Sequence, residues 1–254
     1  MIVDGHATLG RVDDAEFAAE ELLAQMDAAG VDVAIVSPDA REIAVAHRDG
    51  NDRLLELCTR HPGRLLAYAV ANPWLGAHAV AELGRALDAG SVAIKLNPFL
   101  QGFQPIDHLV DPVLELAAEH RVPVYVHSGT PVHCTPFQIA VMASRFPQVP
   151  FILGRGGKTD FKADTPHVLR STPNLYGDTA HDFPLTGILD QLNAGGPSRV
   201  LFTSDFPYGD LRHEVRRVRA LPVDAESLRD VLGENLLRLL PDRARASLAT
   251  GEPG

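Results

Sequence analysis

Short runs of hydrophobic residues alternate with longer amphipathic stretches along the chain, and this alternation predicts strands and helices in regular succession. The hydrophobic runs contain few polar side chains, which is typical of strands that are buried on both faces of a parallel sheet. We predict strands within residues 1–6, 31–38, 64–73, 91–98, 122–129, 150–157, 174–180 and 199–207.

The stretches between the predicted strands have helical periodicity and residues that begin or end helices. Residues 14–30 and 77–90 are amphipathic, and each ends in glycine, which readily closes a helix in the left-handed conformation. Residues 111–121 begin with Asp111 as the expected N-cap, followed by Pro112 in the first turn. These features predict helices over the three stretches.

Eight strands separated by helices, in a chain of 254 residues, favour an α/β fold built as a (β/α)8 barrel of the TIM type. We expect one barrel domain over residues 1–250, with room for slight distortion, and a frayed tail over 251–254. The alternative is a doubly wound open sheet, which usually carries a glycine-rich phosphate-binding turn after its first strand. No such turn follows the first predicted strand, so the barrel is favoured.

The composition of the chain indicates which kinds of binding partner and which cellular compartment to expect. A formal net charge of −10 argues against nucleic acid or an anionic membrane as a partner. The chain has no run of about 18 apolar residues, so we expect neither a membrane-spanning helix nor a signal peptide. Cys58 and Cys134 form no disulfide framework or metal-binding pair and are typical of a reduced, cytoplasmic protein. These features are also compatible with a homo-oligomer.

Polar residues interrupt the hydrophobic pattern at the carboxyl ends of the predicted strands. In a parallel barrel these ends meet on one face, where the active sites of this fold lie. Ionisable groups there are costly to bury unless they serve each other, a ligand or an ion. Any one of these residues alone could equally well be a buried polar group whose hydrogen bonds are made within the protein. Because several of them converge on one face, we favour a functional site. The residues in these positions are Asp4, His6, Thr8, Lys95, Asn97, His127, Arg155, Asp178 and Asp205.

Three of these residues have the chemistry of a catalytic metal site. His6, His127 and Asp205 supply two imidazoles and a carboxylate, a set that binds zinc and leaves one coordination position open for water. We therefore expect one divalent metal ion, with zinc as the first choice. The alternative is a site that works without a metal.

At these positions the sequence resembles the amidohydrolase superfamily, in particular its amidohydrolase-related branch of metal-dependent hydrolases and decarboxylases. The resemblance implies a barrel in which His6, His127 and Asp205 ligate the metal, and Asp205 also handles the proton of the attacking water. In binuclear relatives the lysine of the fourth strand is carbamylated and bridges two metals, which is the minor alternative for Lys95. The segments that carry the resemblance span nearly the whole chain and read IVDGHATLG, SVAIKLNP, VPVYVHSG, RVLFTSDFPYG and VLGENLLRLL.

Two positions depart from that family's pattern and deplete its metal-ligand set. Thr8 stands where the second histidine of the opening Asp-x-His-x-His motif is expected, and a hydroxyl is a weak ligand for a transition metal. Arg155 stands where the sixth strand normally presents a histidine. A guanidinium has no lone pair to donate and repels a cation, but its planar fork suits a carboxylate.

These residues support three hypotheses of function. The first is a metal-dependent hydrolase, or a decarboxylase and therefore a lyase, in which activated water or the metal acts on a small anionic substrate. The second is a metal-independent lactonase or isomerase that uses Asp205 and His127, with Arg155 as the oxyanion or carboxylate binder. The third is a non-catalytic binding protein on the same barrel.

The expected substrate is a small molecule with a carboxylate. Lys95 is expected to remain an ammonium that binds this anion or pairs with Asp178 or Asp205. His133 follows the fifth predicted strand, where a lid or surface role is favoured over that of a replacement ligand. The expected catalytic residues are Asp205, His127 and Arg155, and the expected substrate-binding residues are Arg155, Lys95, Asn97, His181 and Asp178.

Overall fold

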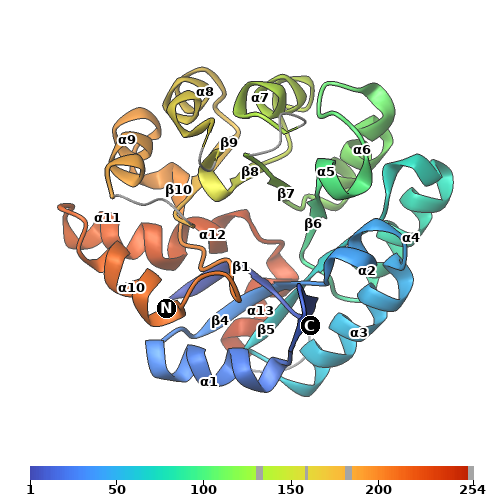
Figure 1. Ribbon diagram of the computed structural model, residues 1–254, viewed down its shortest axis with the longest axis horizontal. Helices are drawn as coiled ribbons and strands as arrows, with labels where there is room; N and C mark the ends of the chain where they lie inside the picture. The colour runs from blue at the N-terminus through green and yellow to red at the C-terminus, as the bar shows by residue number, and fades with distance from the viewer. Residues whose placement is uncertain (130–133, 158–159, 181–184, 251–254) are drawn as a thin grey trace.

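The computed structural model joins the predicted strands in one sheet (Figure 1), and it describes residues 1–129, 134–157, 160–180 and 185–250. Within these residues, eight strands pair in chain order, each parallel to its neighbour. They are β1 (Val3–Thr8), β4 (Val33–Ser37), β5 (Leu65–Ala69), β6 (Ala93–Leu96), β7 (Val124–His127), β8 (Phe151–Gly154), β9 (Leu175–Asp178) and β10 (Val200–Leu201).

The sheet closes on itself between its first and last strands. The Gly5 N–H donates a hydrogen bond to the Phe202 carbonyl oxygen at 2.9 Å, and the Asp205 N–H donates to the His6 carbonyl oxygen at 3.0 Å. Helices surround the closed sheet in Figure 1, so the predicted (β/α)8 barrel is confirmed.

The α-helices lie mainly between consecutive strands and cover the outside of the barrel. Among the described residues, none of them has the length and apolar character that crossing a membrane requires. The helices are α1 (Ala19–Ala29), α2 (Ala40–Ala44), α3 (His47–Arg60), α4 (Ala77–Asp88), α5 (Pro98–Gln101), α6 (Asp111–His120), α7 (Pro136–Arg145), α8 (Thr165–Ser171), α9 (Thr186–Gly195), α10 (Leu211–Arg219), α11 (Ala225–Arg229), α12 (Asn235–Leu239) and α13 (Asp242–Thr250).

Successive residues of a strand pack on opposite sides of the barrel wall. On β4, Ile35 belongs to the interior cluster that includes Tyr68, whereas Val36 packs with Met26 of α1 in the layer outside the wall. All four side chains are fully buried. Burial on both faces explains why the strands are almost uninterrupted hydrophobic runs in the sequence.

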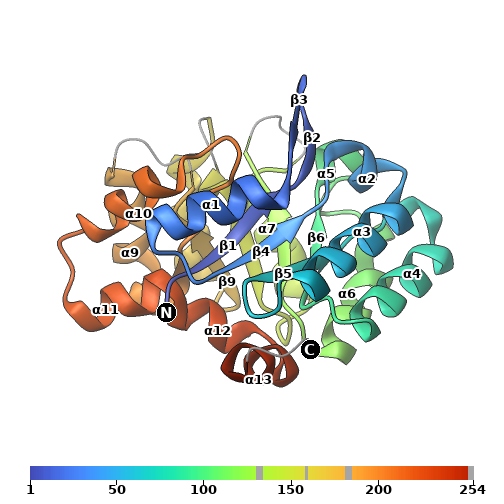
Figure 2. The same ribbon diagram turned by 90° about the horizontal axis from the view of Figure 1, so that it is seen from below.

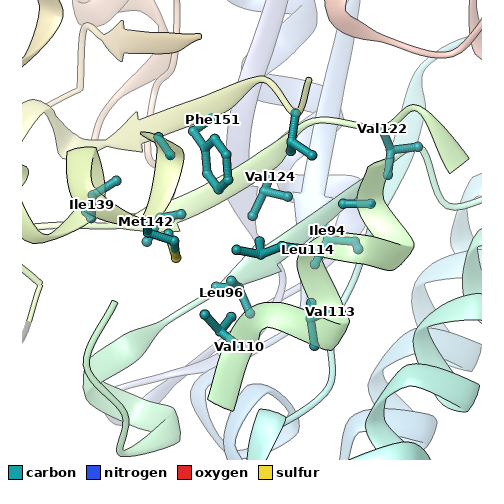
Figure 3. Close-up of a cluster of buried hydrophobic side chains, with 14 of the residues drawn as sticks. Ile94, Leu96, Val110, Val113, Leu114, Val122, Val124, Ile139, Met142 and Phe151 are labelled. Atoms are coloured by element: carbon teal, nitrogen blue, oxygen red, sulfur yellow. The ribbon is translucent and has the colours of Figure 1, made fainter. Parts of the chain in front are cut away.

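The outer layer also fixes the direction of the polar residues on β6 and β7. Figure 3 shows Ile94 and Leu96 of β6 and Val124 of β7 packed with Leu114 of α6 and Met142 of α7. Because side chains alternate along a strand, Lys95, which lies between Ile94 and Leu96, points to the opposite side, into the barrel.

An antiparallel hairpin replaces the first part of the helix predicted over residues 14–30. Strand β2 (Gly10–Val12) pairs with β3 (Ala15–Phe17), and α1 begins only at Ala19. Phe17 packs edge-on against Phe206, with ring centroids 5.7 Å apart. This contact joins residues distant in sequence, which is why local periodicity predicted a helix instead. Figure 2 shows the hairpin projecting on the face of the barrel opposite α13.

The helix predicted over residues 111–121 forms, but with a different cap. Helix α6 begins at Asp111, a 3-10 turn precedes it, and its N-cap is Val110. The carboxylate of Asp111 pairs instead with Arg145 of α7 at 2.8 Å. The Asp111 side chain, predicted to cap the helix, thus forms an ion pair with a residue of another helix instead.

Candidate active site

The carboxyl ends of the strands bring most of the predicted polar residues around one cavity of about 330 Å³. His6 lies on β1, Lys95 on β6 and His127 at the end of β7, while Arg155 follows β8 and Asp205 lies in the segment after β10. The cavity wall includes these five residues together with Thr8, Asn97, Arg11, Asp13 and Tyr208.

A continuous chain of polar contacts crosses the floor of the cavity, the end nearest the barrel interior. Lys95 Nζ donates to Ser37 Oγ at 2.9 Å and lies 2.6 Å from His6 Nε2. The other ring nitrogen, Nδ1, is 3.0 Å from Asp205 Oδ1, and Arg155 Nη2 is 2.7 Å from Asp205 Oδ2. Two cationic side chains therefore hold the His6–Asp205 pair from its two ends.

His6 is buried as a neutral imidazole. Its ring stacks on Tyr125, with centroids 4.5 Å apart and planes within 9°. Burial, and then the positive charge of Lys95, lower the pKa of His6 to about 4. A protonated Lys95 donates to Nε2, which leaves the ring proton on Nδ1, on the side of Asp205. That ring nitrogen lies 3.0 Å from Asp205 Oδ1.

Lys95 is only 3 % exposed, and its surroundings make it a weaker base than an ordinary lysine. Burial lowers its pKa to about 7, Arg155 acts in the same direction, and Asp205 opposes them. Among the described residues no carboxylate lies within ion-pair distance of its ammonium, so the predicted pairing with Asp178 or Asp205 is corrected to contacts with His6 and Ser37.

His127 faces the cavity and has no hydrogen-bond partner in the described part of the chain. Burial, together with the positive charges of Arg155 and Lys95, lowers the pKa of His127 well below its usual value of 6.5. At neutral pH its ring therefore presents one free acceptor nitrogen and one donor to a ligand.

Asp178 lies beneath the cavity rather than in its wall and is fully buried. Its Oδ2 accepts hydrogen bonds from the Arg155 N–H at 2.9 Å and from the Tyr125 hydroxyl at 3.3 Å. Burial raises the pKa of Asp178 to about 8. The structure thus places Asp178 as a support for the Arg155 backbone, in contrast to the substrate contact expected from the sequence.

Asp4 supports the other side of the site. Its carboxylate accepts hydrogen bonds from the Ser204 N–H at 2.8 Å, from the Ser204 hydroxyl and from the His6 N–H at 3.1 Å. Burial raises the pKa of Asp4 to about 7. One buried carboxyl therefore ties the strand that carries His6 to the segment that carries Asp205.

Two other predicted contacts stay predictions. Asn97 lines the cavity, and its Oδ1 accepts a hydrogen bond from the Leu100 N–H at 3.1 Å at the start of α5. His181, like His133, lies outside the described residues.

Arg155 and Asp205 both have left-handed backbone conformations, with φ angles of 63° and 54°. This conformation is costly for residues with a side chain, and such positions cluster at functional sites. Backbone hydrogen bonds hold both residues there, from the Arg155 N–H to Asp178 and from the Asp205 N–H to the His6 carbonyl. The fold therefore fixes the two side chains that meet across the cavity floor.

A sequence model of the family described as amidohydrolase matches residues 3–241, nearly the whole chain. The chain belongs to the amidohydrolase family. The resemblance inferred from the strand-end motifs is therefore confirmed. Comparison with curated proteins gives no match.

Solved structures with a similar barrel include three decarboxylases. The 5-carboxyvanillate decarboxylase from Sphingomonas paucimobilis has a TM-score of 0.76 and 17 % identity, over 94 % of this chain and 98 % of that one. The 2,6-dihydroxybenzoate decarboxylase from Rhizobium has a TM-score of 0.74 and 20 % identity, over 94 % and 98 %. A dihydroxybenzoic acid decarboxylase from Polaromonas, with bound manganese and 2-nitroresorcinol, has a TM-score of 0.77 and 17 % identity, over 94 % and 96 %. At these identities the likeness establishes the fold.

The residues expected to ligate a metal in this protein do not fit a metal ion. Both ring nitrogens of His6 and both carboxylate oxygens of Asp205 already face other side chains. Two of those side chains are Arg155, which is always cationic, and Lys95, and both the guanidinium and the ammonium form of the lysine repel a metal ion at this position. Within the described residues no group of three or more His, Cys, Asp or Glu side chains is placed to hold one. We therefore assign no step to zinc or another divalent ion.

Sequence reasoning missed several side chains of the site, namely Arg11 and Asp13 of the hairpin, Tyr125, Ser37 and Tyr208. Tyr125 lies two residues before His127 on β7, so strand periodicity places both on one face. Ser37 ends β4, where the strand-end rule would have found it. Tyr208 lies in a loop with its ring 5.0 Å from the Arg155 guanidinium carbon, and no local pattern indicates this contact.

Asp178→Asn is expected to change how stability depends on pH. Burial raises the pKa of Asp178 from 3.8 to about 8, so between these values the folded protein holds a proton that the unfolded chain has lost. The stability from this group is therefore lost as the pH rises through that window. Asparagine keeps the acceptor for the Arg155 N–H but does not titrate. The native protein should therefore lose stability relative to the variant as the pH rises. The difference in urea unfolding midpoint, variant minus native, should increase between about pH 5 and about pH 8.

Asp49→Asn on α3 is the matched control, because Asp49 is exposed and has no ion pair in the described part of the chain. Its midpoint difference should stay nearly constant over the same range. Asp4 also titrates in this window, but it does so in both proteins and cancels in the difference. A pH-independent difference for Asp178→Asn would contradict the prediction.

Proposed function

We propose that this amidohydrolase-family protein hydrolyses a small, carboxylate-bearing lactone or ester without a metal ion. The observation that carries the proposal is the contact of two cationic side chains with the expected metal ligands. Lys95 lies 2.6 Å from His6, and Arg155 lies 2.7 Å from Asp205. Positive charge at these atoms can stabilise a developing oxyanion as a metal would. Of the three hypotheses from the sequence, this arrangement supports the metal-independent one.

The charge and size of the cavity support a small anionic substrate. Its volume of about 330 Å³ lies at the small end of the range for ligand pockets. Its charged wall residues are Arg11, Lys95 and Arg155 against Asp13 and Asp205. The whole chain has a net charge of −10, so this excess of cations in the wall is opposite in sign to the protein as a whole. Such a local field attracts a carboxylate.

Asp205 is the group best placed to take the proton of the attacking water. Asp205 is 1 % exposed and reaches the cavity wall. Water adds to the substrate carbonyl carbon, and its proton passes to Asp205. The bond from that carbon to the leaving oxygen then breaks, and Asp205 returns the proton to this oxygen. An alkoxide or enolate is a better leaving group than an amine, which favours a lactone or ester over an amide.

Arg155 is assigned to the oxyanion that forms on the carbonyl. Its Nη2 holds Asp205, and its side chain is 17 % exposed and lines the cavity. The guanidinium therefore keeps donors for a substrate oxygen. His127, which is neutral and free of protein hydrogen bonds in the described chain, is assigned to orient the water.

Decarboxylation of a small aromatic acid is the second candidate. It is supported by the barrel's likeness to decarboxylases of 5-carboxyvanillate and dihydroxybenzoic acid. Phe99 and Tyr208 also give the cavity wall aromatic surface for a ring. It ranks second because the Polaromonas enzyme contains manganese, whereas the side chains here do not fit a metal ion.

A panel of carboxylate-bearing lactones, esters and hydroxybenzoic acids distinguishes the two reactions. The purified protein is incubated with each compound, and products are identified by liquid chromatography and mass spectrometry. Addition of water with ring opening or ester cleavage is the expected result. Loss of carbon dioxide would select the second candidate, and turnover of none of the compounds would argue for the binding-protein hypothesis.

Chelation is expected to leave the turnover of this protein unchanged. After prolonged dialysis against dipicolinate, the metal content should be well below one equivalent per chain and kcat should equal that of untreated protein. A zinc-dependent hydrolase treated in parallel verifies that the chelator removes metal. Activity that disappears on dialysis and returns only with manganese or zinc would refute the metal-independent proposal.

A further inference from the structure

The β2–β3 hairpin adds a third cationic side chain to the cavity wall. Arg11 lies on β2, and the hairpin projects on the face opposite α13 (Figure 2). Arg11 is exposed, whereas Lys95 at the cavity floor is 3 % exposed. The cations of the cavity therefore lie at two depths, one at the outer edge and the others at the floor.

The Arg11 backbone is held in place, but its guanidinium is not paired with a carboxylate. Its N–H donates to Asp39 Oδ2 at 3.1 Å, and it lies opposite Glu16 in the hairpin. Its Nε makes a long contact of 3.4 Å with the Asp13 carbonyl oxygen. Within the described residues, no carboxylate comes within ion-pair distance of this guanidinium. Its terminal nitrogens are thus available to a ligand.

The whole chain has 33 acidic residues against 23 lysines and arginines. An arginine of the cavity wall that has no carboxylate partner in the described chain is therefore a local site of positive charge in an acidic protein. The arginine at the floor, Arg155, pairs with Asp205 at 2.7 Å. Much of the wall is apolar, including Val12, Ile43 and Phe99. The cavity therefore combines cationic groups at two depths with apolar surface, an arrangement complementary to an apolar ligand with an anionic group at each end.

We propose that Arg11 determines substrate specificity by binding a second carboxylate of the substrate, at the end remote from the reacting group. The substrates of this protein are then small dicarboxylates, or lactones that carry a carboxylate at that remote position. This inference rests on the proposed function, because it takes Lys95 and Arg155 as the end of the cavity where the reaction occurs. The planar guanidinium of Arg11 binds a carboxylate through two parallel hydrogen bonds.

Four benzene carboxylates test this inference by binding alone. Benzoate carries one carboxylate, and phthalate, isophthalate and terephthalate carry two at three different separations. Isothermal titration calorimetry at low ionic strength should show that at least one of the three dicarboxylates binds about fivefold or more tightly than benzoate. Added salt should reduce this preference, because an exposed ion pair is screened.

Arg11→Met should remove the preference for the dicarboxylate, because the loss of affinity should be larger for the dicarboxylate than for benzoate. Arg41→Met is the matched control, because Arg41 is an exposed arginine on α2 that does not line the cavity, although its neighbours Ala40 and Ile43 do. This variant changes the net charge equally and should keep the preference. Thermal unfolding of both variants checks that the barrel is intact.

Equal affinity for benzoate and all three dicarboxylates would overturn the inference. A preference that survives Arg11→Met, an equal loss in both variants, or binding of none of the four probes would also overturn it. The measurement involves no turnover, so its outcome is separate from that of the proposed reaction. Metal-dependent activity with the Arg11-dependent preference intact would refute the proposed mechanism and leave the second carboxylate site standing.

Discussion

Asp205→Asn is expected to lower kcat about 10²- to 10⁴-fold without loss of the fold. Asparagine has nearly the same volume and still offers an oxygen to Arg155, which contacts the native carboxylate at 2.7 Å. It cannot accept the proton of the attacking water, so the loss falls on the chemical step. Steady-state kinetics on the substrate identified in the panel measures the effect.

Two controls separate this effect from damage to the barrel. The unfolding midpoint of Asp205→Asn shows whether the buried site is retained, since Asp205 is 1 % exposed. Asp88→Asn removes an exposed carboxylate of α4 remote from the cavity and should keep the native kcat. A kcat within a few-fold of the native value in Asp205→Asn would place the proton transfer on another residue.

Arg155→Met is expected to lower kcat about 10²- to 10³-fold, the usual loss when one oxyanion donor is removed. Arg155→Lys should fall between the native protein and Arg155→Met, because lysine keeps the charge but loses the planar fork. In both variants the change should appear mainly in kcat. A guanidinium that only clamps a ground-state carboxylate would instead raise KM and leave kcat unchanged.

The kinetic pattern of these variants therefore distinguishes the two roles that the sequence left open for Arg155. Arg41→Met, which removes an exposed arginine outside the cavity wall, controls for the change in net charge. Unchanged kcat and KM in both Arg155 variants would reject both roles. The 2.7 Å contact between Arg155 and Asp205 would then be a structural ion pair.

At the cavity floor, two basic side chains contact the residues expected to ligate a metal ion. Lys95 and Arg155 contact opposite ends of the His6–Asp205 pair. Arg155 and Asp205 have φ angles of 63° and 54°. These backbone conformations cost conformational free energy, which the surrounding structure must offset to hold the two side chains in place. The buried carboxyl of Asp178 holds the Arg155 backbone from below at 2.9 Å.

The barrel and the gathering of the site were predictable from the sequence. Hydrophobic runs of strand length, separated by helical periodicity, are a local property of the chain, and burial on both faces explains their composition. Parallel strands in chain order then bring their carboxyl ends to one face. His6, Lys95, His127 and Arg155 meet around one cavity for this reason, although they are far apart in the chain.

Only the tertiary structure decided which partner each polar group takes. The sequence allowed Lys95 to bind the substrate or to pair with Asp178 or Asp205, and only the structure shows that its protein contacts are His6 and Ser37. The sequence also placed Asp178 beside the substrate, whereas Asp178 is fully buried and does not line the cavity.

The sequence also predicted a helix from residue 14, whereas residues 15–17 form the second strand of the hairpin that brings Arg11 to the wall. Periodicity reports which face of an element is buried. The distances that determine ion pairs and hydrogen bonds depend on the tilt of the strands and on loops packed by distant residues, so they arise only when the barrel closes.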